Sequence, residues 1–344
     1  MRRLITLLAS FAIVAGLAAC CCPCGPMIGG GNNRPPNQIV FNPPVINVPQ
    51  PDGNINKPND GKNKPGDGNV GQPKKDPAVA AIEARKGGVT RENNDPNGPV
   101  VEVNLTFTRM NDNDLKGLAP TLAAFPQLRK LKVSQNRSLD RGDGQPGITG
   151  TAFRDLTALQ RLEELDVSSC DISDEGMKQI VATCKKLKVL NIMNNNKIFD
   201  AGIKEVAKLG QLEELDASGL LNGPQLSEPI DSAIKELGKA KQLRKLDLSN
   251  TSVGDLSMAE FAKLPQLQAL TVGSRVTNAG VDELAGHPSL QKLTFITNSS
   301  ITAACVPTLK NMPALQEVVF FTSGKAGTII RNGLVGTTIK VTVK

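Results

Sequence analysis

The amino-acid sequence predicts an α/β solenoid, with parallel strands forming a sheet on the concave side and short helices covering the convex side. Two observations lead to this fold. Three apolar residues, spaced as in Leu162-Glu-Glu-Leu165-Asp-Val167, recur nine times between Val100 and Phe320. Between the copies, a turn is often followed by apolar residues at helical spacing, as at Met177, Ile180 and Val181. Stacked units of this kind share one core and expose one strand face each.

The N-terminal residues have the pattern of a secretory signal peptide. Met1-Arg2-Arg3 is positively charged, residues 4–16 are apolar and uncharged, and small residues precede Cys20. The apolar segment is shorter than the ~20 residues that a permanent membrane-spanning helix requires. Residues 1–19 are therefore expected to direct export and to be cleaved.

The cleavage region Leu17-Ala18-Ala19-Cys20 resembles the bacterial lipobox. The resemblance implies that the Cys20 thiol carries a diacylglycerol group and anchors the protein to a membrane of the cell envelope, facing the periplasm or the cell exterior. An ordinary signal peptide cleaved nearby is the alternative. For Cys21, Cys22 and Cys24, extra lipidation or disulfides are favoured over a metal site, because adjacent cysteines do not converge on one tetrahedral ion without strain.

Residues 20–76 are expected to form the lipidated cysteine and a disordered tether. From Gly25 to Asp76, Pro, Gly and Asn contribute 29 of 52 residues, and no apolar periodicity is present. Such a composition buries too little surface to offset the entropy lost on ordering. The tether's root-mean-square reach is roughly 40 Å. A surface-adhesive segment is the alternative interpretation.

Charge and composition exclude several classes of function. Of the net charge of +7, residues 1–76 carry +4, which leaves +3 for residues 77–344. With no Trp or Tyr and no concentrated basic stripe, a nucleic-acid partner is not supported. The single histidine, His287, lies beside Pro288 and is expected in an exposed loop, without a nucleophile motif. No enzymatic activity and no cofactor are therefore expected.

The folded part is expected to span residues 77–344, with caps at both ends. A short helix at Pro77–Arg85 precedes a turn-rich connector at residues 93–98, and the first strand follows at Val100–Leu105. Two repeats are long, because insertions at Arg137–Gly150 and Leu221–Pro229 follow their strands on the same rim. Alternation at Ile339–Val343 predicts a final strand. The repeats begin at Val100, Leu128, Leu162, Leu187, Leu212, Leu243, Leu267, Leu290 and Leu315.

Helix starts such as Asp174-Glu-Gly176 and Asp200-Ala-Gly202 complete a resemblance to the ribonuclease-inhibitor-like, cysteine-containing subclass of leucine-rich repeats, over about residues 100–323. The resemblance implies a horseshoe-shaped binding scaffold and a buried residue that ends each strand turn. Buried structural thiols are expected at Cys170, Cys184 and Cys305. The strand-turn position is occupied suitably by Asn136, Cys170, Asn195, Thr251 and Asn298, but not by Leu220, Arg275 and Ser323. The hydrogen-bond ladder at this position should therefore be patchy.

Function is expected on the residues between the leucines, because strand alternation sends these side chains to the concave face. The face should have basic residues in the first repeats, acidic residues in the middle and an apolar end. The candidate partner-binding residues are Lys130, Lys132, Glu164, Asp166, Asn191, Glu214, Asp216, Lys245, Asp247, Lys292, Ile296, Val319 and Phe321.

Two hypotheses remain for this surface. The favoured one is a protein partner of unknown identity whose basic groups dock over the acidic middle. The alternative is a self-associating structural protein of the cell envelope, which would use the apolar end. Asp216 and Asp247 should be neighbours across parallel strands, but no loop with calcium-ligand spacing accompanies them, so no metal is assigned. A small-molecule ligand is not expected, and the absence of Trp and Tyr disfavours a glycan.

Overall fold

The computed structural model describes residues 76–142, 144–220, 231–298, 300–321 and 325–344. All of them belong to one compact unit, residues 69–344. The predicted signal peptide, lipid-attachment residue Cys20, Cys21, Cys22, Cys24 and the tether up to residue 75 lie outside the described residues. The same holds for the insertion Leu221–Pro229 and for Ser323.

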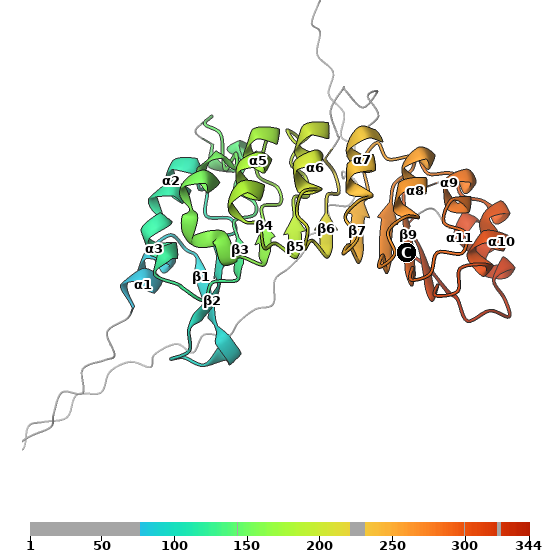
Figure 1. Cartoon of the computed structure of the whole chain (residues 1–344), viewed down its shortest axis with the longest axis horizontal. Helices are drawn as coiled ribbons and strands as arrows, with labels where there is room; N and C mark the ends of the chain where they lie inside the picture. The colour runs from blue at the N-terminus through green and yellow to red at the C-terminus, as the bar shows by residue number, and fades with distance from the viewer. Residues whose placement is uncertain (1–75, 143, 221–230, 299, 322–324) are drawn as a thin grey trace, which may run out of the picture. The chain divides into compact units, whose positions relative to one another are not determined.

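The described residues form an eleven-stranded sheet in which every strand pairs with its neighbours in sequence (Figure 1). Strands β2 to β11 run parallel, and β1 pairs antiparallel with β2. The strands are β1 (Gly88–Arg91), β2 (Val100–Asn104), β3 (Lys130–Lys132), β4 (Glu164–Asp166), β5 (Val189–Asn191), β6 (Glu214–Asp216), β7 (Lys245–Leu248), β8 (Ala269–Val272), β9 (Lys292–Ile296), β10 (Glu317–Phe321) and β11 (Lys340–Val343).

Short helices line the opposite side of this unit, as Figure 1 shows. Within the described ranges, no helix has the length and apolar character needed to cross a bilayer. The α-helices are α1 (Pro77–Glu83), α2 (Asp112–Gly117), α3 (Ala119–Ala123), α4 (Ser138–Arg141), α5 (Asp174–Thr183), α6 (Asp200–Val206), α7 (Asp231–Leu237), α8 (Asp255–Phe261), α9 (Asn278–Asp282), α10 (Val306–Lys310) and α11 (Lys325–Gly333). The 3₁₀ helices are η1 (Glu92–Asn94), η2 (Thr151–Asp155), η3 (Thr157–Arg161) and η4 (Ala303–Cys305).

The core lies between the sheet and the helices. The central residue of each three-residue strand, such as Leu165 or Leu190, is buried and pairs in register with its counterpart on the next strand. The predicted solenoid is therefore confirmed, together with the helix after Asp76 and the final strand. Strand β1, which lies between the predicted helix and the predicted connector, was not predicted.

The turn after each strand is held by a buried side chain. Asn195 donates to the carbonyls of Val167 and Ile192, each at 2.9 Å, and its Oδ1 accepts the Ile172 N–H at 3.0 Å. Asn136 makes the equivalent bonds, and Asn298 donates to the carbonyls of Gly273 and Val276 in the preceding repeat. The thiol of Cys170 supplies a single bond, to Val133 O at 3.2 Å. The position after Asn195 in the array is Leu220, which is buried and apolar, so the predicted patchy ladder is confirmed.

Carboxylates at the helix starts link each repeat to the next. Asp174 of α5 accepts the N–H groups of Phe199 and Gly202, at 2.7 and 2.9 Å, and so caps α6. Asp200 caps α7 in the same way through the Ala233 N–H. A β-carbon at Gly202 would lie 2.5 Å from Asp174 Oδ1, which explains the Asp-x-Gly pattern. The glycine permits the close approach that this capping requires.

Candidate functional site

The sheet register arranges the side chains of the concave face in two rows that cross the strands. The first row contains the residue just before the central buried residue of each strand, and the second row contains the residue two positions later. The first row runs through Glu102, Lys130, Glu164, Val189, Glu214, Lys245, Ala269, Lys292, Glu317 and Lys340. The second row runs through Asn104, Lys132, Asp166, Asn191, Asp216, Asp247, Thr271, Thr294, Val319 and Thr342.

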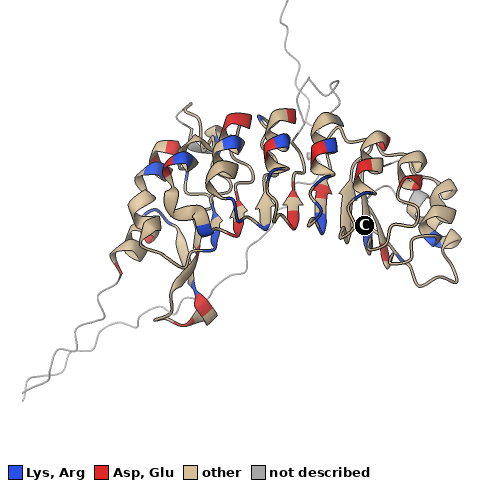
Figure 2. Cartoon of the chain, viewed as in Figure 1, with Lys and Arg blue, Asp and Glu red and all other residues tan. Residues whose placement is uncertain are grey.

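Charges in the first row neutralise one another. Lys130 lies 2.8 Å from Glu164, Lys245 lies 2.6 Å from Glu214, and Lys292 lies 2.8 Å from Glu317. Figure 2 shows acidic and basic segments side by side along the strands. Bonds from Lys292 and then Thr342 lower the pKa of Glu317 below its usual range.

One further ion pair crosses from the second row to the first. Lys132 lies 2.8 Å from Glu102, and this contact raises the pKa of Lys132. The basic residues predicted for the first repeats are therefore paired within the protein. The acidic middle is correspondingly narrower than the sequence indicated, because Glu164 and Glu214 are paired with lysines.

Aspartates of the second row have a structural role. Oδ1 of Asp166, Asp216 and Asp247 accepts the N–H group two residues later, at 2.9 to 3.0 Å. Asn104 and Asn191 make the same bond at equivalent positions. The bond shapes the turn that ends the strand and needs only one acceptor oxygen. Asn and Asp are therefore interchangeable for the turn but not for the charge.

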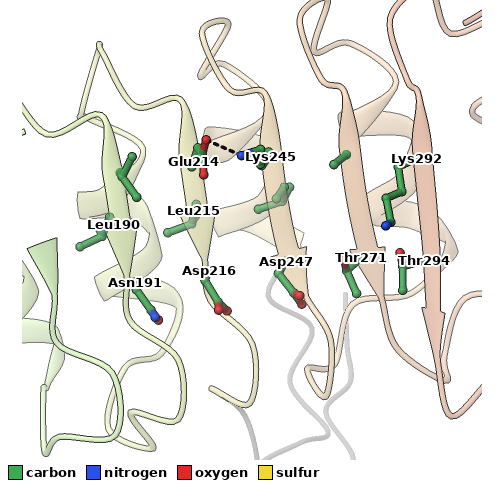
Figure 3. A pocket seen from close by; sticks show the side chains of 13 residues that line it. Leu190, Asn191, Glu214, Leu215, Asp216, Lys245, Asp247, Thr271, Lys292 and Thr294 are labelled. Atoms are coloured by element: carbon green, nitrogen blue, oxygen red, sulfur yellow. Dashed lines mark hydrogen bonds and ion pairs between the residues drawn. The ribbon is translucent and has the colours of Figure 1, made fainter. Parts of the chain in front are cut away.

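A hollow of about 370 Å³ opens on the face of β5 to β9. Figure 3 shows the Asp216 and Asp247 side chains next to each other at the ends of their strands, beyond the Glu214–Lys245 pair. The predicted adjacency of these two aspartates is confirmed by their register pairing. Val189 and Ala269, which carry no charge, line the hollow beside the ion pair. Asp216 and Asp247 are thus the charged residues of the hollow that have no lysine partner.

The environment of Asp247 disfavours its charged form. Burial raises the pKa of the Asp247 carboxyl, and the nearby Asp216 charge adds to the increase. Hydrogen bonds from Ser249 and Thr271 act in the opposite direction. A cation placed between the two carboxylates would remove their mutual repulsion and favour the ionised form of both.

The apolar end differs from the sequence-based expectation. Val319 is 2% exposed and so does not contribute an accessible surface, because strand alternation fixes the direction of a side chain but not its accessibility. Phe321 is 38% exposed, and the Lys344 ammonium lies 5.2 Å from the centre of its ring. Ile296 pairs in register with Phe321 and is half-buried.

The prediction that His287 lies exposed in a loop was wrong. Its side chain is buried at 3% exposure, and Nδ1 accepts the N–H groups of Leu290 and Ser289 at 3.2 and 3.4 Å. Burial lowers the pKa of His287, and this effect is opposed by the backbone carbonyls of Phe261 and Leu264. The sequence contained a signal that His287 is buried. It lies three residues before the leucine that begins its repeat, and in other repeats this position is apolar, as at Leu209 and Leu264.

Sequence reasoning also missed part of the face. Glu102, Ala269 and Lys340 complete the first row but had not been assigned to it. Among the residues that the structure describes, no group of three or more His, Cys, Asp or Glu side chains is placed to hold a metal ion. The buried thiols expected at Cys170, Cys184 and Cys305 are confirmed.

Comparisons with known proteins identify the repeat. The family model described as "Leucine Rich repeat" matches residues 159–181 and 183–207. No curated protein matches the sequence.

The solved structures that are similar to this chain include the following three. Internalin C2 from Listeria monocytogenes has 19% identity and a TM-score of 0.45, over 71% of this chain and 93% of that chain. Internalin inlF from the same species has 17% identity and a TM-score of 0.40, over 64% and 62%. Human 5T4, the trophoblast glycoprotein, has 16% identity and a TM-score of 0.44, over 64% and 76%.

Proposed function

This chain folds as a leucine-rich-repeat solenoid, and we propose that it is a non-catalytic scaffold that binds a protein partner through its concave face. The observation that carries the proposal is the hollow on β5 to β9, where Asp216 and Asp247 lie side by side without a lysine partner. The partner presents a lysine or arginine side chain that enters the hollow and lies between the two carboxylates.

The distribution of charge supports a cationic group at this position. Glu214 is already neutralised by Lys245, so an incoming cation gains most beside the aspartates of the second row. Each of these aspartates uses Oδ1 for its turn, and a carboxylate has the capacity to accept further hydrogen bonds from a partner group. Hydrogen bonds between charged groups are about twice as strong as neutral ones. The ion pairs of the first row set which other partner charges are tolerated, and so contribute selectivity.

The proposed location follows from the N-terminal sequence alone. Cleavage before Cys20 and lipidation of that residue would anchor the protein to a membrane of the cell envelope, with residues 21–76 as the tether of the repeat domain. Labelling of the full-length protein with an alkyne fatty acid checks this directly. The wild type should be labelled and Cys20→Ser should not. Labelling of Cys20→Ser would show that another residue carries the lipid.

We further propose that the repeats belong to the ribonuclease-inhibitor-like, cysteine-containing subclass. The Asp-x-Gly helix starts support this assignment, because they allow one repeat to cap the helix of the next, as Asp174 caps α6. The short α-helices of this unit and the buried thiol of Cys170 in a strand turn are consistent with it.

Crosslinking and capture from native membranes tests the binding site. The variant Asp216→Asn/Asp247→Asn removes both charges and keeps the turn acceptors, as Asn104 and Asn191 demonstrate. Asp166→Asn is the matched control, because it removes the same charge from the same row outside the hollow. The double variant should lose the protein that the wild type captures, and the control should retain it. Equal capture by the double variant would refute the proposed site.

Self-association through the apolar end has less support. Val319 is buried, and Lys344 lies over Phe321. Light scattering of the full-length protein and of Phe321→Asp decides between the two functions. An oligomer that dissociates in the variant would favour the structural role.

A further inference from the structure

A recurring hydrogen bond closes the turn that leads into the strands of this array. In seven of the described repeats, the N–H group of the leucine that begins the repeat donates to the carbonyl oxygen three residues earlier. The bond joins Leu128 to Phe125 at 3.0 Å, Leu212 to Leu209 at 3.2 Å and Leu267 to Leu264 at 3.2 Å. The same bond is present at Leu162, Leu187, Leu243 and Leu315. The residue that supplies the carbonyl is apolar and buried in each case.

One repeat uses a side chain instead. His287 occupies the position of the buried apolar residue, between α9 and β9, and the Leu290 N–H donates to its imidazole Nδ1 at 3.2 Å. The Ser289 N–H points to the same nitrogen at 3.4 Å. A titratable ring therefore closes this turn, where a backbone carbonyl closes the equivalent ones.

This arrangement is compatible with only one protonation state. Nδ1 accepts two N–H groups and so carries no proton, which places the proton of the neutral ring on Nε2. Nε2 is buried and has no hydrogen-bond partner in the described part of the chain. A second proton on Nδ1 would face two donors and would add a charge to a side chain that is 3% exposed.

We propose that His287 is an acid-sensitive closure of the turn into β9: the neutral ring holds residues 286–290 closed, and protonation opens them. The consequence reaches the concave face, because β9 supplies Lys292 and Thr294 to the hollow. Opening loosens the C-terminal side of this hollow at low pH and leaves the preceding repeats folded.

Neighbouring charges do not compensate for the proton. The charged residues on and beside the adjoining elements are Asp255 and Glu260 of α8, Lys263 just after α8, Asp282 and Glu283 at the end of α9, and Lys292 of β9. The pKa of His287 is lowered by burial, and the opposing contributions come from the carbonyls of Phe261 and Leu264 rather than from these residues. With a depressed pKa in the closed state, the turn is fully stabilised above the ordinary value of 6.5 and loses stability as pH falls below it.

Nuclear magnetic resonance of the full-length protein tests the ring directly. The chain has a single histidine, so its imidazole signals need no assignment by mutation, provided that the purification tag lacks histidine. At pH 7.5 the nitrogen shifts should identify the Nε2–H tautomer, and the ring should titrate below 6.5. A proton on Nδ1 at pH 7.5, or a midpoint at or above 6.5, would overturn the proposal.

Hydrogen exchange tests the opening. After correction for the intrinsic pH dependence of exchange, protection of Leu290 should fall by up to about 30-fold between pH 7.5 and pH 5.0, the limit for a ring that stays neutral while the turn is closed. Protection at the matched Leu267 should stay constant. His287→Leu, which copies Leu209 and Leu264, should abolish the pH dependence at Leu290. Unchanged protection in the wild type, or an equal loss in His287→Leu, would contradict the mechanism.

Discussion

Replacing the buried Asn195 by alanine should remove a large share of the stability of the repeat array. The side chain is fully buried and makes short hydrogen bonds to Val167 O, Ile192 O and the Ile172 N–H. Alanine leaves these three backbone groups without a partner, and each such group costs about 1–3 kcal/mol. The expected loss for three groups is about 3–9 kcal/mol, against about 5–15 kcal/mol for a typical domain.

Guanidinium unfolding of the full-length protein, followed by circular dichroism, measures this loss. The free-energy change is obtained from the shift in the unfolding midpoint, provided that the m-value is the same for both proteins. Asn196→Ala is the matched control, because that neighbouring side chain is exposed, and it should change stability by less than about 0.5 kcal/mol. Asn195→Cys should be intermediate, since Cys170 makes one bond at the equivalent position. A cost below about 1 kcal/mol for Asn195→Ala, or one equal to that of the control, would refute the reasoning.

Three further changes probe the scaffold. Gly202→Ala should destabilise by about 1–3 kcal/mol in denaturant, because the added carbon meets Asp174 Oδ1 at 2.5 Å, whereas Gly210→Ala, with open space around it, should be near neutral; equal effects would contradict the capping account. Burial raises the pKa of Cys184 to about 12, so iodoacetamide at pH 8 should modify it only after unfolding, and rapid labelling of the native protein, detected by mass spectrometry, would disprove its burial. Phe107 is 71% exposed at a φ of 60°, where left-handed backbone is costly for a bulky residue, so Phe107→Asn should raise the melting temperature; a decrease would indicate that Phe107 packs against the fold.

The repeat pattern was sufficient to predict the strands and their register. One spacing of leucines specifies both the buried residues of a strand and the distance to the next copy, so equivalent positions pair across the sheet. The adjacency of Asp216 and Asp247 followed from this rule. Strand β1 did not, because Gly88–Arg91 is short, lacks an apolar alternation and is defined by its antiparallel pairing with β2.

Details of the candidate site depend on contacts between strands. Considered one strand at a time, Glu164 and Glu214 belong to an acidic centre, but Lys130 and Lys245 on adjacent strands neutralise them. The sequence also did not show that the second-row aspartates shape the turn after the strand, because this bond depends on the backbone conformation there. By contrast, alignment of the repeats on the leucines that begin them would have placed His287 in the core.

Site-specific photocrosslinking gives the most direct test of the proposed concave binding site. A photoreactive amino acid at Ala269 lines the hollow, and one at Ala201 lies exposed on helix α6. If the partner binds as proposed, irradiation of intact cells should link it at position 269 and not at position 201. Linkage at position 201 alone, or equal linkage at both, would contradict a partner seated on the concave face.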